Sequence, residues 1–145
     1  MTVTFVSGDI FSSGCQALVN PVNCVGVMGA GLALSFKNRF PYNFTQYKKA
    51  CASGLITIGS CLTIREGETW IINFPTKTHF KNKSELNYIS NGLPSLINEL
   101  NKHKIISVAI PALGCGLGGL NVKEVKPVIE AAFKNLHFDV KFFVN

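Results

Sequence analysis

The sequence is poor in acidic residues. Only eight of its 145 residues are Asp or Glu, against fourteen Lys and Arg. Asp9 is the only acid before Glu66, so an active site built from a pair of carboxylates is difficult to assemble. The net charge of +6 instead favours anionic partners such as nucleotides, phosphates or nucleic acid.

Long apolar runs and a secretion signal are also missing. No run approaches the roughly 20 apolar residues that a membrane-spanning helix needs. Residues 1–20 are interrupted by Asp9 and Asn20, and they lack the basic start and apolar stretch of a signal peptide. We therefore expect a soluble protein of the cytoplasm.

The cysteines and histidines form no recognisable framework. The five cysteines are odd in number and scattered, with no CxxC pair and no Cys/His ligand spacing, and the three histidines are isolated. We therefore expect a reducing compartment, no disulfide framework and no metal site.

Length and an apolar content of 47% indicate one folded domain over residues 1–145. Short β-branched runs predict strands, and apolar residues at helical spacing predict helices between them. The expected strands are Val3–Val6, Ala17–Asn20, Ser60–Arg65 and Trp70–Phe74 (paired as a hairpin), Ile105–Ile110 and Val140–Val144. The expected helices are Leu32–Arg39, one from Pro41 to Gly54, one along Leu86 to Leu100, and one carrying Val128 to Leu136. This alternation predicts a three-layer αβα sandwich around a central mixed sheet of about six strands.

Prolines and caps mark several expected boundaries. Pro21 is expected to end the second strand, and Pro94 to kink its helix or mark the true start of that helix. Asn121 and Glu124 have the spacing of a capping box, and Pro127 is expected to start the last helix.

Two glycine-rich loops, Gly26–Gly31 and Pro111–Gly119, follow two of the most apolar strands. Glycine lets amide N–H groups converge on an anion, and open α/β sheets bind ligands at the carboxyl ends of their strands. Neither loop has a GxGxxG or Gly-Lys-Ser/Thr fingerprint, which disfavours a Rossmann dehydrogenase and a P-loop NTPase. Ordinary turns are the alternative interpretation of each loop.

Cys115 lies inside the second glycine-rich loop, where converging amides could turn its thiol into a nucleophile. No Arg follows to complete a phosphatase-type Cys loop, and no His has an evident reason to be near. We therefore expect Cys115 to be a small filler residue.

Three motifs occur together in an order typical of one family. They are Gly8-Asp9-Ile10, Ala17-Leu-Val-Asn-Pro-Val-Asn23 and Ala109-Ile-Pro-Ala-Leu-Gly-Cys-Gly-Leu-Gly-Gly-Leu120. With them the chain resembles the macrodomain family of ADP-ribose-binding modules over essentially its whole length. Three shorter stretches are similar to the subgroup that removes ADP-ribose from thymidine in DNA, and to relatives that remove it from acidic side chains: Gly29-Ala-Gly-Leu-Ala33, Asn73-Phe-Pro-Thr-Lys77 and Gly114-Cys-Gly-Leu-Gly-Gly119.

The resemblance implies a set of ADP-ribose contacts. Asp9 would accept a hydrogen bond from the adenine amino group, and Asn20 and Asn23 would face the distal ribose. Phe142 or Phe143 would border the adenine, and alternation along a strand leaves the other in the core. The implied contacts are Gly8, Asp9, Ile10, Asn20, Val22, Asn23, Gly29, Gly31, Leu32, Ala33, Thr76, Gly114, Cys115, Gly116, Leu117, Gly118 and Phe143, with the amides of Gly114–Gly118 on the diphosphate.

The same residues have plainer interpretations when they are taken one at a time. Asp9 alone would be a turn or cap residue. Asn20 and Asn23 alone would be buried amides that support a loop.

Lys77 decides between an enzyme and a reader of ADP-ribose. A lone lysine is usually solvated, but here it matches the position of the catalytic lysine in the subgroup. Near the ribose C1″ an amine acts as a nucleophile toward the opened sugar or, as an ammonium, stabilises the leaving group. In glutamate-directed relatives an acid in the second loop helps release the lysine adduct, and the matching position here is Gly118, which favours the DNA-directed relatives.

The resemblance therefore implies an ADP-ribosyl glycohydrolase acting on thymidine-linked ADP-ribose in DNA, with Lys77 catalytic and Asn23 positioning the ribose. The alternatives are a hydrolase of ester-linked ADP-ribose (ADP-ribosyl-glutamate, O-acetyl-ADP-ribose or ADP-ribose 1″-phosphate) and a non-catalytic reader. No cofactor is expected, because ADP-ribose is the ligand or product. The expected partners are ADP-ribosylated DNA or protein and a DNA ADP-ribosyltransferase toxin, and nothing demands more than a monomer. Lys77, His79, Lys81 and Lys83 could meet a nucleic-acid backbone.

Overall fold

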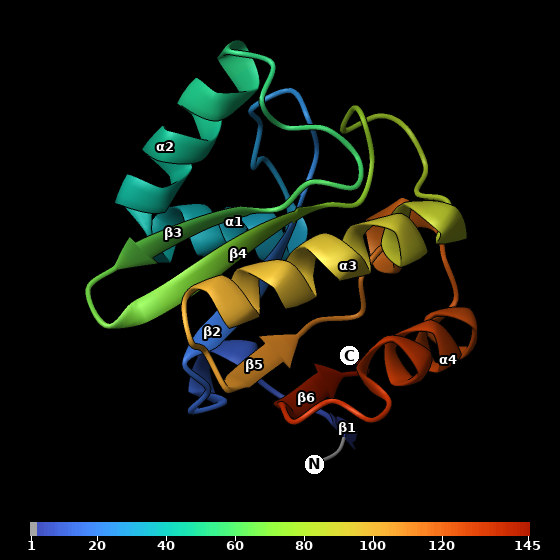
Figure 1. Cartoon of the computed structure of the whole chain (residues 1–145). Coiled ribbons are helices and arrows are strands. Elements are labelled where there is room, and N and C mark those ends of the chain that lie inside the picture. The colour runs from blue at the N-terminus through green and yellow to red at the C-terminus, as the bar shows by residue number, and fades with distance from the viewer. Residues whose placement is uncertain (1–2) are drawn as a thin grey trace.

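The middle layer of the structure is one six-stranded sheet with the order β1-β6-β5-β2-β4-β3. The computed structural model describes residues 3–145 (Figure 1). Neighbouring strands run parallel throughout this sheet except for β3, which is antiparallel to β4. The strands are β1 (Val3–Val6), β2 (Ala17–Val22), β3 (Leu62–Glu66), β4 (Thr69–Pro75), β5 (Ser107–Ile110) and β6 (Asp139–Phe143).

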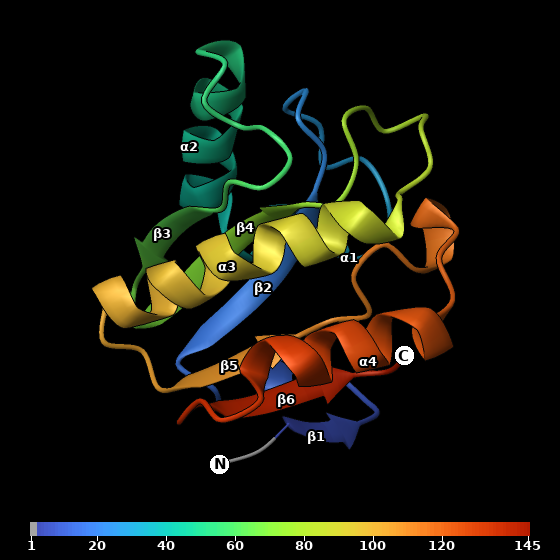
Figure 2. The ribbon, with the colours of Figure 1, turned by 45° about the vertical axis from the view of Figure 1, so that its right-hand side comes forward.

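Helices cover both faces of this sheet (Figures 1 and 2). α3 and α4 pack on one face, and α1 and α2 pack on the other. The helices are α1 (Gly31–Arg39), α2 (Pro41–Ala52), α3 (Leu86–Lys102) and α4 (Val122–Phe133), with two 3-10 turns, η1 (Ile10–Ser12) and η2 (Gly116–Gly118). The predicted three-layer αβα sandwich with a mixed six-stranded sheet is confirmed. None of the helices in the described part of the chain is long and apolar enough to cross a membrane.

Alternation along the strands supplies both apolar faces. Val19 and Ile72 belong to the core under α3 and α4, whereas their neighbours Leu18 and Ile71 pack with Phe36 of α1. All five residues are buried. Because central parallel strands are covered on both faces, they appear in the sequence as continuous apolar runs.

β2 continues through Pro21 to Val22, so the prediction that Pro21 ends this strand is wrong. The Val22 carbonyl accepts a hydrogen bond from the Thr76 amide at 2.8 Å, which places that carbonyl on the β4 side. Pro21 precedes Val22 and therefore faces the β5 side, where pairing with β5 ends at Leu18. Because β5 no longer pairs with β2 at this position, the missing N–H of Pro21 removes no hydrogen bond from the sheet.

Two prolines lie inside helices. The capping box of Asn121 and Glu124 is formed at the start of α4, so the prediction that Pro127 starts this helix is wrong. α3 likewise begins before Pro94 and continues through it. Both prolines are exposed, so water can satisfy the backbone carbonyl that each of them leaves without its helical donor.

Strand boundaries at the sheet centre differ by one or two residues from the prediction. The strand expected from Ile105 begins at Ser107, because the Ile105 amide donates to the Leu100 carbonyl at 2.9 Å and completes the end of α3. β6 begins at Asp139 and ends at Phe143. Neither shift moves a residue to the other face of the sheet.

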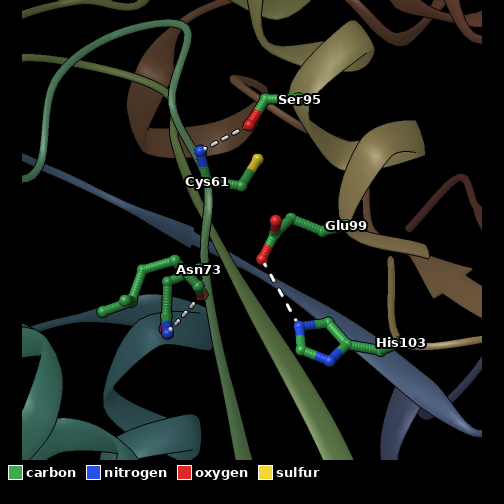
Figure 3. Close-up of polar contacts among 6 residues, drawn as sticks. Cys61, Asn73, Ser95, Glu99 and His103 are labelled. Carbon is green, nitrogen blue, oxygen red and sulfur yellow. Dashed lines mark hydrogen bonds and ion pairs between the residues drawn. The ribbon is translucent and has the colours of Figure 1, made fainter. Parts of the chain in front are cut away.

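β3 and β4 form the predicted antiparallel hairpin, and α3 is fastened to it. The Ser95 hydroxyl accepts a hydrogen bond from the Cys61 amide at 2.9 Å just before β3 (Figure 3). One turn further along α3, Glu99 lies 3.7 Å from the His103 ring nitrogen (Figure 3). The Ser95 contact joins α3 to the start of the hairpin, whereas the Glu99–His103 pair lies at the C-terminal end of α3 itself.

Candidate functional site

The parallel strands β1, β2, β4, β5 and β6 all end at one edge of the sheet, where open α/β sheets bind ligands. A cleft of about 1240 Å³ lies at this edge. Ligand pockets measure roughly 300–1,000 Å³, so the cleft has room for a nucleotide-sized ligand. Its walls include residues at the end of each of these strands or just after it: Gly8–Phe11, Val22–Asn23, Thr76–Lys77, Pro111–Ala112 and Phe143–Asn145.

Nearly all of the predicted site residues line this cleft. They are Gly8, Asp9, Ile10, Val22, Asn23, Gly29, Gly31, Leu32, Ala33, Thr76, Lys77, Gly114, Cys115, Gly116, Leu117, Gly118 and Phe143. Phe142 is fully buried in the core under α3 and α4, so the alternation along β6 leaves Phe143 as the cleft residue. Segments from the beginning, middle and end of the chain thus meet at one place.

Asp9 lines the cleft and also caps the turn that follows β1. Its Oδ1 accepts a hydrogen bond from the Phe11 amide at 3.0 Å, and its Oδ2 accepts one from the Ser12 hydroxyl at 3.1 Å. The cap role expected for an isolated Asp is therefore confirmed. The carboxylate remains exposed at the wall of the cleft.

Asn20 is a predicted contact that the structure does not bring to the cleft wall. It is fully buried, and its Nδ2 donates to Asn73 Oδ1 at 3.1 Å. Asn43 Nδ2 donates to the same oxygen at 3.1 Å, and Asn73 Nδ2 donates back to Asn43 Oδ1 at 2.8 Å. These three amides, the asparagine cluster, join β2, α2 and β4 beneath the cleft.

Asn23 organises the loop that begins the first glycine-rich segment. Its Oδ1 accepts hydrogen bonds from the Val25 amide at 3.0 Å and the Val27 amide at 3.4 Å, and its Nδ2 donates to the Val27 carbonyl at 2.8 Å. The Tyr47 hydroxyl lies 2.8 Å from both Asn23 O and Asn23 Oδ1. Burial raises the pKa of Tyr47, so the hydroxyl keeps its proton and donates a hydrogen bond to Asn23.

Tyr47→Phe is expected to lower the free energy of unfolding by about 1–2 kcal/mol, because buried oxygens of Asn23 lose a donor. Tyr42→Phe is the matched control, since Tyr42 is on the same helix, is exposed, and makes no side-chain hydrogen bond in the described chain. Urea denaturation of both variants measures the difference. Equal stability of the two variants would contradict the role given to Tyr47.

The first glycine-rich loop leads into an uncapped helix. The N-cap of α1 is Ala30, which has no side-chain oxygen to cap the helix. Gly31, Leu32 and Ala33 form the first turn, and all three line the cleft. The first amides of a helix have no partner within it and carry partial positive charge, so this helix start is suited to hold an anion.

The second glycine-rich loop offers amides from the opposite side. Cys115 and Gly118 donate their amides within the loop, whereas no backbone acceptor within residues 3–145 is found for the Leu117 amide. Gly114, where the loop turns, has φ +76°, and a Cβ there would lie 2.6 Å from Leu120 Cδ1. Only glycine therefore fits at this turn without moving the loop.

Gly118 is packed against Ser84, which precedes α3. Its carbonyl accepts a hydrogen bond from the Ser84 amide at 2.9 Å, and a Cβ at Gly118 would lie 2.6 Å from Ser84 Oγ. The Ser84 hydroxyl is buried and has no hydrogen-bond partner in the described chain. The loop thus has no room for an acidic side chain at this position unless Ser84 moves.

Gly118→Ala is expected to lower the free energy of unfolding by about 1–3 kcal/mol through overpacking. Ser84→Ala removes the closest atom, so it should restore part of that loss in the double variant while costing little by itself. Chemical denaturation of the two single variants and the double variant gives the coupling free energy. Additive effects of the two substitutions would show that the contact does not limit the loop.

Cys115 has no environment that would activate its thiol. Burial, and to a smaller extent the charge of Glu124, raises its pKa, which is the opposite of what a nucleophile needs. Within residues 3–145 no group of three His, Cys, Asp or Glu side chains could hold a metal ion. These observations favour the filler role for Cys115.

Lys77 leaves the end of β4 and lines the cleft in a half-buried position. Its Nζ donates to the Phe80 carbonyl at 3.3 Å. Among the described residues that line the cleft, the other cationic side chains are those of Arg39, Lys81 and Lys83, and the only acidic one is that of Asp9. The cleft is therefore positively charged, with Lys77 in reach of its interior.

Some of these supporting residues were not anticipated from the sequence. Asn73 is a polar residue in the middle of an apolar strand, and that contrast is a signal that a search for buried amides would detect. Tyr47 and Ser84 carry no such signal, because their partners lie 24 residues away in the chain for Tyr47 and 34 residues away for Ser84.

The fold and the site define an α/β domain with an anion-binding cleft at the carboxyl edge of a mixed sheet. The family model of the Macro domain matches residues 19–129. The chain therefore belongs to the Macro domain family, as the motifs of the sequence indicate.

Individual relatives match nearly the whole chain. The chain is 47% identical over 138 residues to a DNA ADP-ribosyl glycohydrolase of Mycobacterium tuberculosis, covering 92% of this chain and 39% of that protein. It is 35% identical over 161 residues to a DNA ADP-ribosyl transferase-DNA ADP-ribosyl glycohydrolase fusion protein of Thermosipho africanus, covering 98% and 42%. The solved macrodomain of Mycobacterium tuberculosis DarG has a TM-score of 0.94 and 44% identity, covering 98% of this chain and 97% of that structure. The chain spans about two fifths of the length of the curated relatives it matches.

Proposed function

We propose that this chain, as a single macrodomain over residues 1–145, binds ADP-ribose and removes it by hydrolysis from thymidine in ADP-ribosylated DNA. One observation carries the proposal: Lys77, at the end of β4, enters the same cleft that both glycine-rich loops form. The cleft thereby combines an anion-binding surface with a side chain able to assist bond cleavage. The activities named for the relatives in Mycobacterium tuberculosis and Thermosipho africanus support this proposal.

The two glycine-rich loops suit the diphosphate of ADP-ribose. The uncapped first turn of α1 and the free amide of Leu117 line one cleft. Neutral amides bind phosphate oxygens well because their N–H groups are already oriented. We assign the adenine to the Asp9 and Phe143 end of the cleft, and the distal ribose to the end with Asn23.

Lys77 is the residue that we propose to be catalytic. In the hydrolysis, the bond between the ribose C1″ and the base breaks, the hydroxyl of water is added to C1″, and the proton of water ends on the base. As an ammonium, Lys77 would stabilise the negative charge that develops on the departing base. Gly118, packed against Ser84, leaves this chain without the acid that releases a lysine adduct in glutamate-directed relatives, which favours the ammonium role.

A DNA ADP-ribosyltransferase is the functional partner that fits this proposal. Such an enzyme would supply the modified thymidine that the macrodomain restores. The Thermosipho africanus relative is named as a fusion of the two activities. We propose no cofactor, because water and the modified DNA contain all the atoms of the reaction.

A panel of substrates tests the proposed function. Purified protein would be incubated with a single-stranded oligonucleotide carrying ADP-ribosylated thymidine, with an ADP-ribosyl-glutamate peptide and with ADP-ribose 1″-phosphate, and the products read by mass spectrometry. The expected result is free ADP-ribose and an oligonucleotide with unmodified thymidine. Release from the esters alone would identify an ester hydrolase, and calorimetric binding of ADP-ribose without any release would identify a reader.

A further inference from the structure

An exposed aromatic side chain lies at the mouth of the cleft. Phe80 is 45% exposed and lines the cleft. It lies in the segment between β4 and α3, two residues before Asn82 and three before Lys83. The His79 ring lies against it, with ring centroids 4.2 Å apart and planes inclined by 32°. An exposed phenyl ring loses the stabilisation that burial would bring, and neither ring is needed to hold the diphosphate.

The segment that carries Phe80 is ordered by its own hydrogen bonds. The Asn82 amide donates to the His79 carbonyl at 3.0 Å, and the Lys81 amide donates to His79 Nδ1 at 3.1 Å. Lys77 Nζ donates to the Phe80 carbonyl at 3.3 Å. The phenyl ring is therefore presented to solvent from a fixed turn directly connected to the proposed catalytic lysine.

The charge around Phe80 is of one sign. Lys77, Lys81 and Lys83 all line the cleft, and the sequence has no acidic residue between Glu68 and Glu85. Because Lys77 belongs to this segment, a polyanion bound at Lys77 would lie beside the other two lysines. Aromatic rings flanked by cations are the surface on which single-stranded nucleic acids bind, since bases stack on the rings while phosphates pair with the cations.

We propose that Phe80, supported by His79, stacks on an unpaired base next to the modified thymidine, with Lys81 and Lys83 on the flanking phosphates. This inference rests on the proposed function and adds the side chain that holds the DNA strand next to the modified thymidine. A base in a duplex is covered on both faces by its neighbours, so its face is not free to meet a side chain. Phe80 thus selects unpaired DNA and holds it across the mouth of the cleft.

Phe80→Ala is expected to lower kcat/KM on an ADP-ribosylated single-stranded oligonucleotide by about 5- to 100-fold, the range for loss of one base–aromatic stack. Release from ADP-ribosylated thymidine nucleoside, which has no neighbouring base, should not fall. Phe80→Trp should keep the activity on the oligonucleotide. Ile106→Ala is the matched control, because Ile106 is 64% exposed and lies before β5, at the opposite end of that strand from the cleft.

Binding of an unmodified single strand, followed by fluorescence anisotropy, tests the same surface without any turnover. Phe80→Ala should weaken this binding and leave its salt dependence unchanged, whereas Lys81→Ala should reduce the salt dependence. Equal affinity of Phe80→Ala and the parent chain for the strand, or an equal fall in activity on oligonucleotide and nucleoside, would overturn the inference. Absence of release from both substrates by the parent chain would overturn the proposed function instead, while the anisotropy result would still decide the role of Phe80.

Discussion

Lys77→Ala is expected to reduce kcat for release of ADP-ribose from ADP-ribosylated DNA by at least about 100-fold, the loss typical of removing a group that stabilises transition-state charge. Affinity for free ADP-ribose should change little, because we assign the diphosphate to the amides of the two glycine-rich loops. Single-turnover kinetics with a thymidine-modified oligonucleotide, together with calorimetry of ADP-ribose binding, measures the two quantities separately.

Two further variants make the Lys77 result specific. Lys81→Ala removes an exposed cation from the same cleft, so it should weaken DNA binding without a comparable loss of kcat. Lys77→Arg keeps the positive charge but cannot act as an amine nucleophile, so partial activity would support electrostatic stabilisation of the leaving group. Release by Lys77→Ala at the parent rate would remove Lys77 from the mechanism.

Asn73→Ala is expected to lower the free energy of unfolding by about 3–5 kcal/mol, because several buried groups lose their partners together. Asn73 lies on β4 (Figure 3) and holds Asn20, Asn43 and the Leu62 carbonyl, the last at 3.1 Å. Its loss would loosen β4 just before Lys77. Urea denaturation followed by circular dichroism gives the size of the effect.

Asn98→Ala is the control for this substitution. Asn98 is exposed on α3 and makes no side-chain hydrogen bond in the described chain, so the free energy of unfolding should change by less than about 1 kcal/mol. A similar small change for Asn73→Ala would show that the asparagine cluster does not stabilise the sheet.

Local patterns were sufficient to predict most of the fold. The β-branched runs at Val3–Val6 and Trp70–Phe74 predicted strands, and the capping box at Asn121 predicted a helix start, because these signals depend on residues close in the chain. The prolines were misleading. Pro21 continues a strand and Pro127 lies inside a helix, since their tolerance depends on whether the missing N–H had a partner, and that is decided by neighbouring elements.

The candidate site shows the same division. Glycine-rich segments that follow buried strands could be placed at the carboxyl edge from the sequence, because successive parallel strands must end there. The position of Asn20 beneath the cleft could not be predicted from the sequence, because whether its side chain faces the cleft or the interior depends on Asn43 and Asn73. The exposure of Phe80 beside Lys77 could not be predicted either, because an aromatic residue is usually expected in a core.

By itself, the sequence determined the class of fold, the two amide-rich loops and the shortage of acids that makes Lys77 the proposed catalytic residue. These features depend on composition and on neighbours in the chain, where propensity and glycine geometry act. Only the tertiary structure decided which polar groups reach the cleft, which support it from below and which aromatic ring is exposed beside Lys77. These are contacts between residues distant in the sequence, and no local pattern specifies them.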